Sequence, residues 1–116
     1  MHSHMDQFIK DATRTESKDF PAITNRFSTQ RDVRLLHAAM GLSTESAELL
    51  DAFKKHLFYG RPLDIVNFRE ELGDILWYVA LALDELDVAF ETFARVVIAK
   101  LGVRYPERFT EQRAEN

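Results

Sequence analysis

The stretch of sequence that decides the fold is residues 63–86, which reads LDIVNFREELGDILWYVALALDEL. Its apolar residues recur at steps of three and four, which is the spacing of one helix face and not of a β-strand. That face comprises Phe68, Leu72, Ile75, Val79, Leu83 and Leu86. We therefore expect a helix from residue 63 or 64 to 86, with Asp64 in its first turn, where the helix dipole favours an anion.

The same spacing predicts three more helices, at residues 6–15, 29–57 and 88–101, with Ser28 as the N-cap of the long one. Pro21 breaks the N-terminal part, and the Gly60-Arg61-Pro62 tripeptide makes a turn. With no strand pair in sight, the expected fold class is all-α, a four-to-five-helix bundle. The helix at 88–101 is apolar around much of its circumference, so we expect a homo-oligomer, a dimer or a tetramer, to complete the bundle.

Length and composition predict a single domain over residues 1–116, with 1–5 as an expression scar or disordered start and 107–116 as a C-terminal tail. The chain has no cysteine, which excludes disulfides and thiolate metal sites. Its net charge of -4 argues against nucleic-acid binding. No targeting segment is visible, and the longest apolar run is far shorter than the roughly 20 residues that span a membrane. We expect a cytoplasmic protein with no membrane partner.

Two short motifs each place acidic side chains three residues apart, Glu45-Ser46-Ala47-Glu48 and Glu71-Leu72-Gly73-Asp74. On a helix, the two acids of a pair point to nearly the same side. Both pairs flank apolar stripes, since Glu71 lies only about 40° from Ile75 around its helix. Like charges at this spacing repel, and half-buried carboxylates without a partner are costly or take up a proton.

A cation among these carboxylates would explain the arrangement. Oxygen ligands without His or Cys suit Mg²⁺, with Mn²⁺ as a substitute, better than Zn²⁺. A single acidic pair is more often a solvated helix face, and 19 residues of this chain are acidic. Two pairs on consecutive long helices favour a metal site. Its predicted ligands are Glu45, Glu48, Glu71 and Asp74.

The ordered set of motifs resembles the MazG-like superfamily of all-α nucleoside triphosphate pyrophosphohydrolases, whose hallmark is an E-x-x-E helix followed by an E-x-x-D helix. Here twenty-two residues separate Glu48 from Glu71. The E-E-L-G-D-x-x-W-Y form at residues 70–78 and the K-L-x-x-R-Y-P tail at 100–106 are similar to the family's sequences. The resemblance covers roughly residues 35–109. Thr44 stands where some relatives carry an extra acid, so a role for that acid is not carried over.

The resemblance implies Mg²⁺-dependent hydrolysis of a (deoxy)nucleoside triphosphate to the monophosphate and pyrophosphate, by metal-activated water attacking the α-phosphorus. The four acids would hold the metal, and one of them, for which we favour Glu48, would act as general base. The candidates for substrate binding are Lys55, Tyr78, Lys100 and Arg104. Without the resemblance, the three cations among them would be interpreted as solvated surface charges. We expect His37 to be structural and Trp77 to lie in the core or an interface.

Two other classes of function stay open at this point. The first is a non-catalytic metal-binding interaction bundle, which predicts Mg²⁺ binding without turnover. The second is a hydrolase of related fold that acts on another phosphoanhydride nucleotide: a dUTPase-type enzyme, or one that cleaves phosphoribosyl-ATP or an alarmone. The motifs select neither the base nor the sugar.

Overall fold

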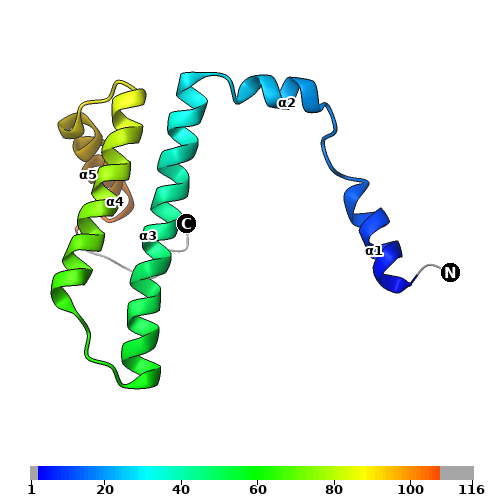
Figure 1. Ribbon diagram of the computed structural model, residues 1–116. Coiled ribbons are helices and arrows are strands. Elements are labelled where there is room, and N and C mark those ends of the chain that lie inside the picture. Colours follow the sequence, from blue (N-terminus) through cyan, green and yellow to red (C-terminus); the bar gives the residue numbers. More distant parts are fainter. Residues whose placement is uncertain (1–2, 108–116) are drawn as a thin grey trace. The chain divides into compact units, whose positions relative to one another are not determined.

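The computed structural model describes residues 3–107. They form five helices and no strand: α1 His4–Thr13, α2 Phe20–Arg26, α3 Gln30–Tyr59, α4 Ile65–Glu85 and α5 Phe90–Arg104 (Figure 1). The predicted all-α class with four to five helices is confirmed. The chain divides into two compact units, Met1–Val33 and Arg34–Asn116. No helix of the described part combines the length and the apolar character that crossing a membrane requires.

The first unit holds a helix that the sequence did not predict. The sequence suggests a break at Pro21, yet Pro21 lies in the first turn of α2, and the Asp19 side chain caps that helix by accepting a hydrogen bond from Ala22 N. Proline suits this position because its missing N–H would have no partner there in any case. Helix α1 begins with a capping box between Ser3 and Asp6. The predicted break at Pro21 is therefore wrong.

The start of α3 is capped one residue later than predicted. Thr29 Oγ1 accepts a hydrogen bond from Asp32 N, and the Thr29 carbonyl accepts one from Val33 N. Ser28 instead donates its hydroxyl to the Asn25 carbonyl at the end of α2. Ser28 belongs to the preceding turn, so Thr29 supplies the side-chain acceptor that the first N–H groups of α3 need.

Helices α3 and α4 form an antiparallel pair within the second unit (Figure 1). Their contacts run in opposite directions along the two chains: Arg34 pairs with Glu85, His37 meets Tyr78, and Phe53 packs edge-on against Phe68. Gly60, with φ of 71°, ends α3 in the left-handed region. Asp64 caps α4 by accepting a hydrogen bond from Asn67 N, immediately before the helix and not in its first turn as predicted.

The second unit is thin and leaves much apolar surface exposed. Among the described residues, Ala38 is the single buried hydrophobic side chain. The predicted inner stripe of α4 holds at Phe68, Ile75, Val79 and Leu83, which are half-buried, but Leu72 and Leu86 are exposed. On α5 the exposed apolar side chains include Phe90, Phe93, Val97 and Leu101, at 37–55%. Apolar surface of this extent is typical of a protein that associates.

Candidate functional site

Three of the predicted acids meet where the middle of α3 faces the middle of α4. Glu45, Glu71 and Asp74 each offer one carboxylate oxygen, and these oxygens all lie within 4.8 Å of one another. Glu45 and Glu71 are half-buried, whereas Asp74 is exposed. Glu45 lies on the face of α3 that carries the most buried residues of this helix, Ala38 and Gly41. A hard cation suits three oxygens placed in this way.

The fourth predicted acid, Glu48, lies beside this cluster of three. Its side chain is exposed, and its pKa is raised above the ordinary value, first by the adjacent Glu71 carboxyl group. The structure therefore brings all four acids into one neighbourhood but separates them by position. Glu45, Glu71 and Asp74 form the compact set, which we call the carboxylate cluster, and Glu48 lies at its edge.

The buried oxygens of the carboxylate cluster lack a partner. Glu45 Oε2 and Glu71 Oε2 are both buried, and no hydrogen-bond partner reaches either of them within residues 3–107. The Glu45 carboxyl group, and then burial, raise the pKa of Glu71, because two adjacent carboxyl groups can bond only if one keeps a proton. A buried acceptor without a donor is destabilising. When it is ionised, the cluster thus lacks a positive charge, which a cation would supply.

A cavity of about 380 Å³ opens beside the carboxylate cluster and is lined by Glu45, Asp74, Trp77 and Tyr78. This size falls in the range of small-molecule sites. Two of its lining residues are acidic and two are aromatic. Such a lining suits a ligand with both an anionic part, held through a cation, and a flat part.

The two aromatic residues that line the cavity belong to a cluster of three rings. The Trp77 and Tyr78 ring centroids are 5.0 Å apart at 89°, and His37 of α3 lies 5.8 Å from Tyr78 and 6.1 Å from Trp77. These are edge-to-face geometries, which aromatic rings prefer. Trp77 is 56% exposed, so of the two predicted positions, core or interface, the core position is wrong and the interface stays a prediction. The inner face of α4 is centred on Ile75 and Val79, and Trp77 lies outside that face, where it lines the cavity.

The predicted phosphate-binding cations lie on two helices. Lys55 Nζ is 2.8 Å from Asp51 Oδ2 within α3, and this pairing lowers the pKa of Asp51. Lys100 is exposed on α5, and Arg104 is half-buried at the end of the same helix. Contacts between these cations and a phosphate stay predictions.

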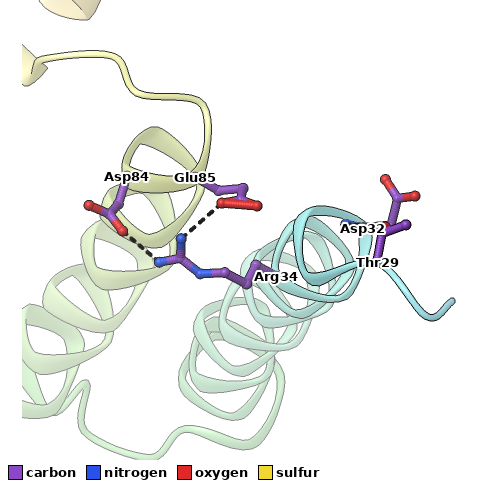
Figure 2. A network of polar contacts seen from close by, with 5 residues as sticks. All are labelled: Thr29, Asp32, Arg34, Asp84 and Glu85. Atoms are coloured by element: carbon purple, nitrogen blue, oxygen red, sulfur yellow. Dashed lines mark hydrogen bonds and ion pairs between the residues drawn. The ribbon is translucent and has the colours of Figure 1, made fainter.

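A second acidic group on the same helix pair is paired with an arginine of the protein itself. At the end of α4, Asp84 Oδ2 and Glu85 Oε2 lie 2.7 Å and 3.0 Å from the Arg34 guanidinium nitrogens (Figure 2). Asp84 first, and then Glu85, raise the pKa of Arg34. The sequence analysis did not identify this pairing of Arg34 with Asp84 and Glu85. The available signal was an arginine at the start of one helix and two acids at the end of the next, which an antiparallel pair brings together.

Comparison with known protein families identifies a match. The family model described as the MazG nucleotide pyrophosphohydrolase domain matches residues 35–109. This range contains both acidic motifs, the aromatic cluster and all the predicted phosphate-binding cations. No curated protein and no solved structure matches the chain.

Proposed function

The chain belongs to the MazG nucleotide pyrophosphohydrolase family, and from this premise we propose that it hydrolyses a (deoxy)nucleoside triphosphate to the monophosphate and pyrophosphate with Mg²⁺ as cofactor. The observation that carries the proposal is the pair of buried, unpartnered oxygens on Glu45 and Glu71, next to a cavity with an aromatic wall. Mn²⁺ is expected to substitute for Mg²⁺ because it takes similar oxygen ligands. The cytoplasmic location stays a prediction.

The donor set fits a hard divalent cation. Glu45, Glu71 and Asp74 would hold it, with Glu48 at the edge of the same cluster as a further ligand or a base. All the donors are carboxylate oxygens, which suit Mg²⁺ or Mn²⁺. The family match supports this proposal because both acidic motifs lie inside it. When bound, Mg²⁺ would neutralise phosphate charge and activate the attacking water.

Other roles in the proposed hydrolysis fall to side chains of the protein. In the proposed reaction, water attacks the α-phosphorus, the bond from that phosphorus to the bridging oxygen breaks, and pyrophosphate leaves. Glu48 accepts the proton of the water, because it lies next to the carboxylate cluster without belonging to its compact set of three. The Tyr78 hydroxyl contacts the sugar or a phosphate from the cavity wall. Lys55, Lys100 and Arg104 balance the phosphate charge.

A product assay tests the proposal. A panel of canonical and modified nucleoside triphosphates is incubated with Mg²⁺, with Mn²⁺ and with excess EDTA, and the products are separated by chromatography. We expect monophosphate and pyrophosphate with either metal and none with EDTA. Diphosphate plus orthophosphate would place the attack at another phosphorus. Mg²⁺ binding with no product from any nucleotide would favour the non-catalytic bundle, and turnover in EDTA would remove the metal from the mechanism.

We also propose that the chain works as a homo-oligomer, with a dimer as the minimal unit and a tetramer as the alternative. The apolar side chains exposed on α5 support this, since pairing of helices across a two-fold axis would cover them. Sedimentation at micromolar concentration is expected to give a species heavier than the 13.5 kDa chain. A single species of that mass would contradict the proposal.

The oligomer raises the question of whether neighbouring chains share a site. Lys100 and Arg104 lie on α5, the helix proposed to form the interface. We expect a mixture of Arg104→Ala and Glu48→Gln chains to regain activity that neither variant has alone. No recovery in mixed oligomers would place the whole site within one chain.

A further inference from the structure

Gly41 of α3 is buried, and the ring of Tyr78 occupies the space where a side chain at that position would stand. A Cβ atom built on Gly41 would fall well inside contact distance of Tyr78 Cε1, Cδ1 and Cζ. These atoms belong to the stiff ring and not to a flexible chain end, so they cannot move aside singly. The Tyr78 ring therefore rests directly on the backbone of α3, and only glycine allows this.

The other described glycines show that this arrangement is particular to Gly41. A Cβ on Gly73 or Gly102, which also lie inside helices, would meet nothing within 4 Å. Glycine within a helix costs about 1 kcal/mol relative to alanine. In α3 the contact with Tyr78 offsets that cost, whereas in α4 and α5 no neighbouring atom requires a glycine.

The contact of the Tyr78 ring with the backbone at Gly41, which we call the seat of Tyr78, determines the shape of the cavity. Gly41 precedes Glu45 by one helical turn, and Tyr78 follows Asp74 by one turn, so the seat lies one turn from the carboxylate cluster on both helices. The His37 and Trp77 rings also pack against Tyr78, with ring centroids 5.8 Å and 5.0 Å from that of Tyr78. Tyr78 lines the cavity together with Glu45 and Asp74. A displaced ring would enter or leave the space beside the acids.

We propose that Gly41 is a positioning residue for nucleotide recognition: by seating the Tyr78 ring on α3, it fixes the aromatic wall against which the nucleoside part of the substrate binds. The inference rests on the proposed function, because it takes a nucleotide as the ligand of the cavity. Gly41 touches neither substrate nor metal in this scheme and acts through Tyr78. Loss of the seat thus weakens nucleotide binding and leaves the cation site in place.

The test combines binding, kinetics and fluorescence on the Gly41→Ala chain. Trp77 is the sole tryptophan of the sequence and adjoins Tyr78, so its emission reports the position of that ring. We expect Gly41→Ala to change Trp77 emission and to raise the Kd of an α,β-imido nucleoside triphosphate by about tenfold, as loss of one aromatic contact does. KM should rise with little change in kcat. Binding of Mn²⁺ alone, followed by electron paramagnetic resonance, should change by less than about threefold.

Two further variants show whether Gly41 acts through Tyr78. Gly41→Ala/Tyr78→Ala should match Tyr78→Ala in Kd and in emission, because the clash disappears with the ring. Gly102→Ala, the matched control in open space, should leave the Kd and emission unchanged. Unchanged Kd and emission in Gly41→Ala would overturn the proposal, as would a double variant that binds more weakly than Tyr78→Ala. If the unaltered chain binds no nucleotide analogue, the recognition role fails along with the proposed function, and Trp77 emission then shows separately whether Gly41 seats the ring.

Discussion

The α3–α4 pair treats its two acidic groups in opposite ways. At one end, Arg34 lies between Asp84 and Glu85 with nitrogen–oxygen distances of 2.7 Å and 3.0 Å (Figure 2). In the middle, Glu45 and Glu71 each keep a buried oxygen for which the described residues provide no partner. Both groups lie on the same two helices, so the helix pair clearly can hold an arginine opposite acids. The cluster in the middle is left without one.

The difference separates architecture from function. A partly buried carboxylate is stable when a guanidinium satisfies it, and such a pair fixes the register of two helices. In the middle of the pair, neighbouring carboxyl groups raise the pKa of Glu48 and of Glu71, and their repulsion weakens the metal-free fold. A cluster that is costly without a ligand therefore points to the ligand that relieves it. Substituting one acid of either group at a time tests this distinction.

The largest effect is expected from the acids without a partner. Glu71→Gln should lower turnover by about a thousandfold or more, because it removes a charged oxygen from the proposed cation site, and Glu48→Gln should do the same by removing the base. Circular dichroism should show unchanged helix content. Glu91→Gln on α5 is the control and should keep near-normal rates. Normal turnover in both motif variants would remove these residues from the site.

The acids held by Arg34 should behave in the reverse way. Glu85→Gln is expected to lower Tm by a few degrees while turnover stays normal, because the Glu85 side chain is only 14% exposed and its loss leaves Arg34 less well compensated. Asp84→Asn is the matched control: its side chain is 75% exposed, so solvent screens the pair and Tm should hardly change. Thermal unfolding in parallel with the product assay measures both. Lost turnover in Glu85→Gln with an unchanged Tm would overturn the distinction between the two groups.

The third prediction concerns pH. The pKa values of Glu48 and Glu71 are raised above the ordinary 4.5, mainly by neighbouring carboxyl groups. Below about pH 4.5 both carboxyl groups are protonated, and the stability that the folded state gains from their protonation is fully present. This stability is lost as the pH rises through the raised pKa values and the two groups ionise. In EDTA, Glu71→Gln should have a higher Tm than the unaltered chain at neutral pH, and this advantage should shrink on acidification.

Added Mg²⁺ should remove that advantage, since a bound cation stabilises the folded, ionised cluster. Comparing Glu71→Gln with the unaltered chain at each pH cancels the titration of other groups. These include Asp32 and Asp51, whose lowered pKa values make stability rise with pH. A difference in Tm that does not vary with pH or Mg²⁺ would mean that Glu71 carries no strain in the metal-free chain.

Local signals were enough to predict the fold class and four of the five helices. The periodic segments became α1, α3, α4 and α5 with ends displaced by a few residues. Helix α2 was missed because Pro21 was interpreted as a breaker, although proline at a helix start has no such effect. The acidic motifs could be identified because their spacing is local. Spacing along the chain does not determine how one helix is rotated against another. The exposure of Leu72 and Trp77 and the Gly41–Tyr78 contact depend on that rotation, so they could not be predicted.

The smallest effect is expected from an acid whose partner is one of the proposed phosphate ligands. Asp51 holds Lys55 with an oxygen–nitrogen distance of 2.8 Å, on an exposed part of α3 where such pairs add little stability. If Lys55 binds a phosphate of the substrate, Asp51 competes with that phosphate. Asp51→Asn should then lower KM by about twofold, and Lys55→Met should raise KM several-fold.

A double variant separates this competition from a general effect of charge. In the Lys55→Met background, Asp51→Asn should leave KM unchanged, because no lysine remains to be released. Lys54→Met removes the same charge one residue away, where the nitrogen lies 4.0 Å from Asp51, and should have a smaller effect than Lys55→Met. All these differences should weaken with added salt, since the groups are exposed. Equal changes in KM for Lys54→Met and Lys55→Met would show that substrate binding depends only on the net charge of this surface. Lys55 would then be a solvated surface residue whose pair with Asp51 only stabilises the helix.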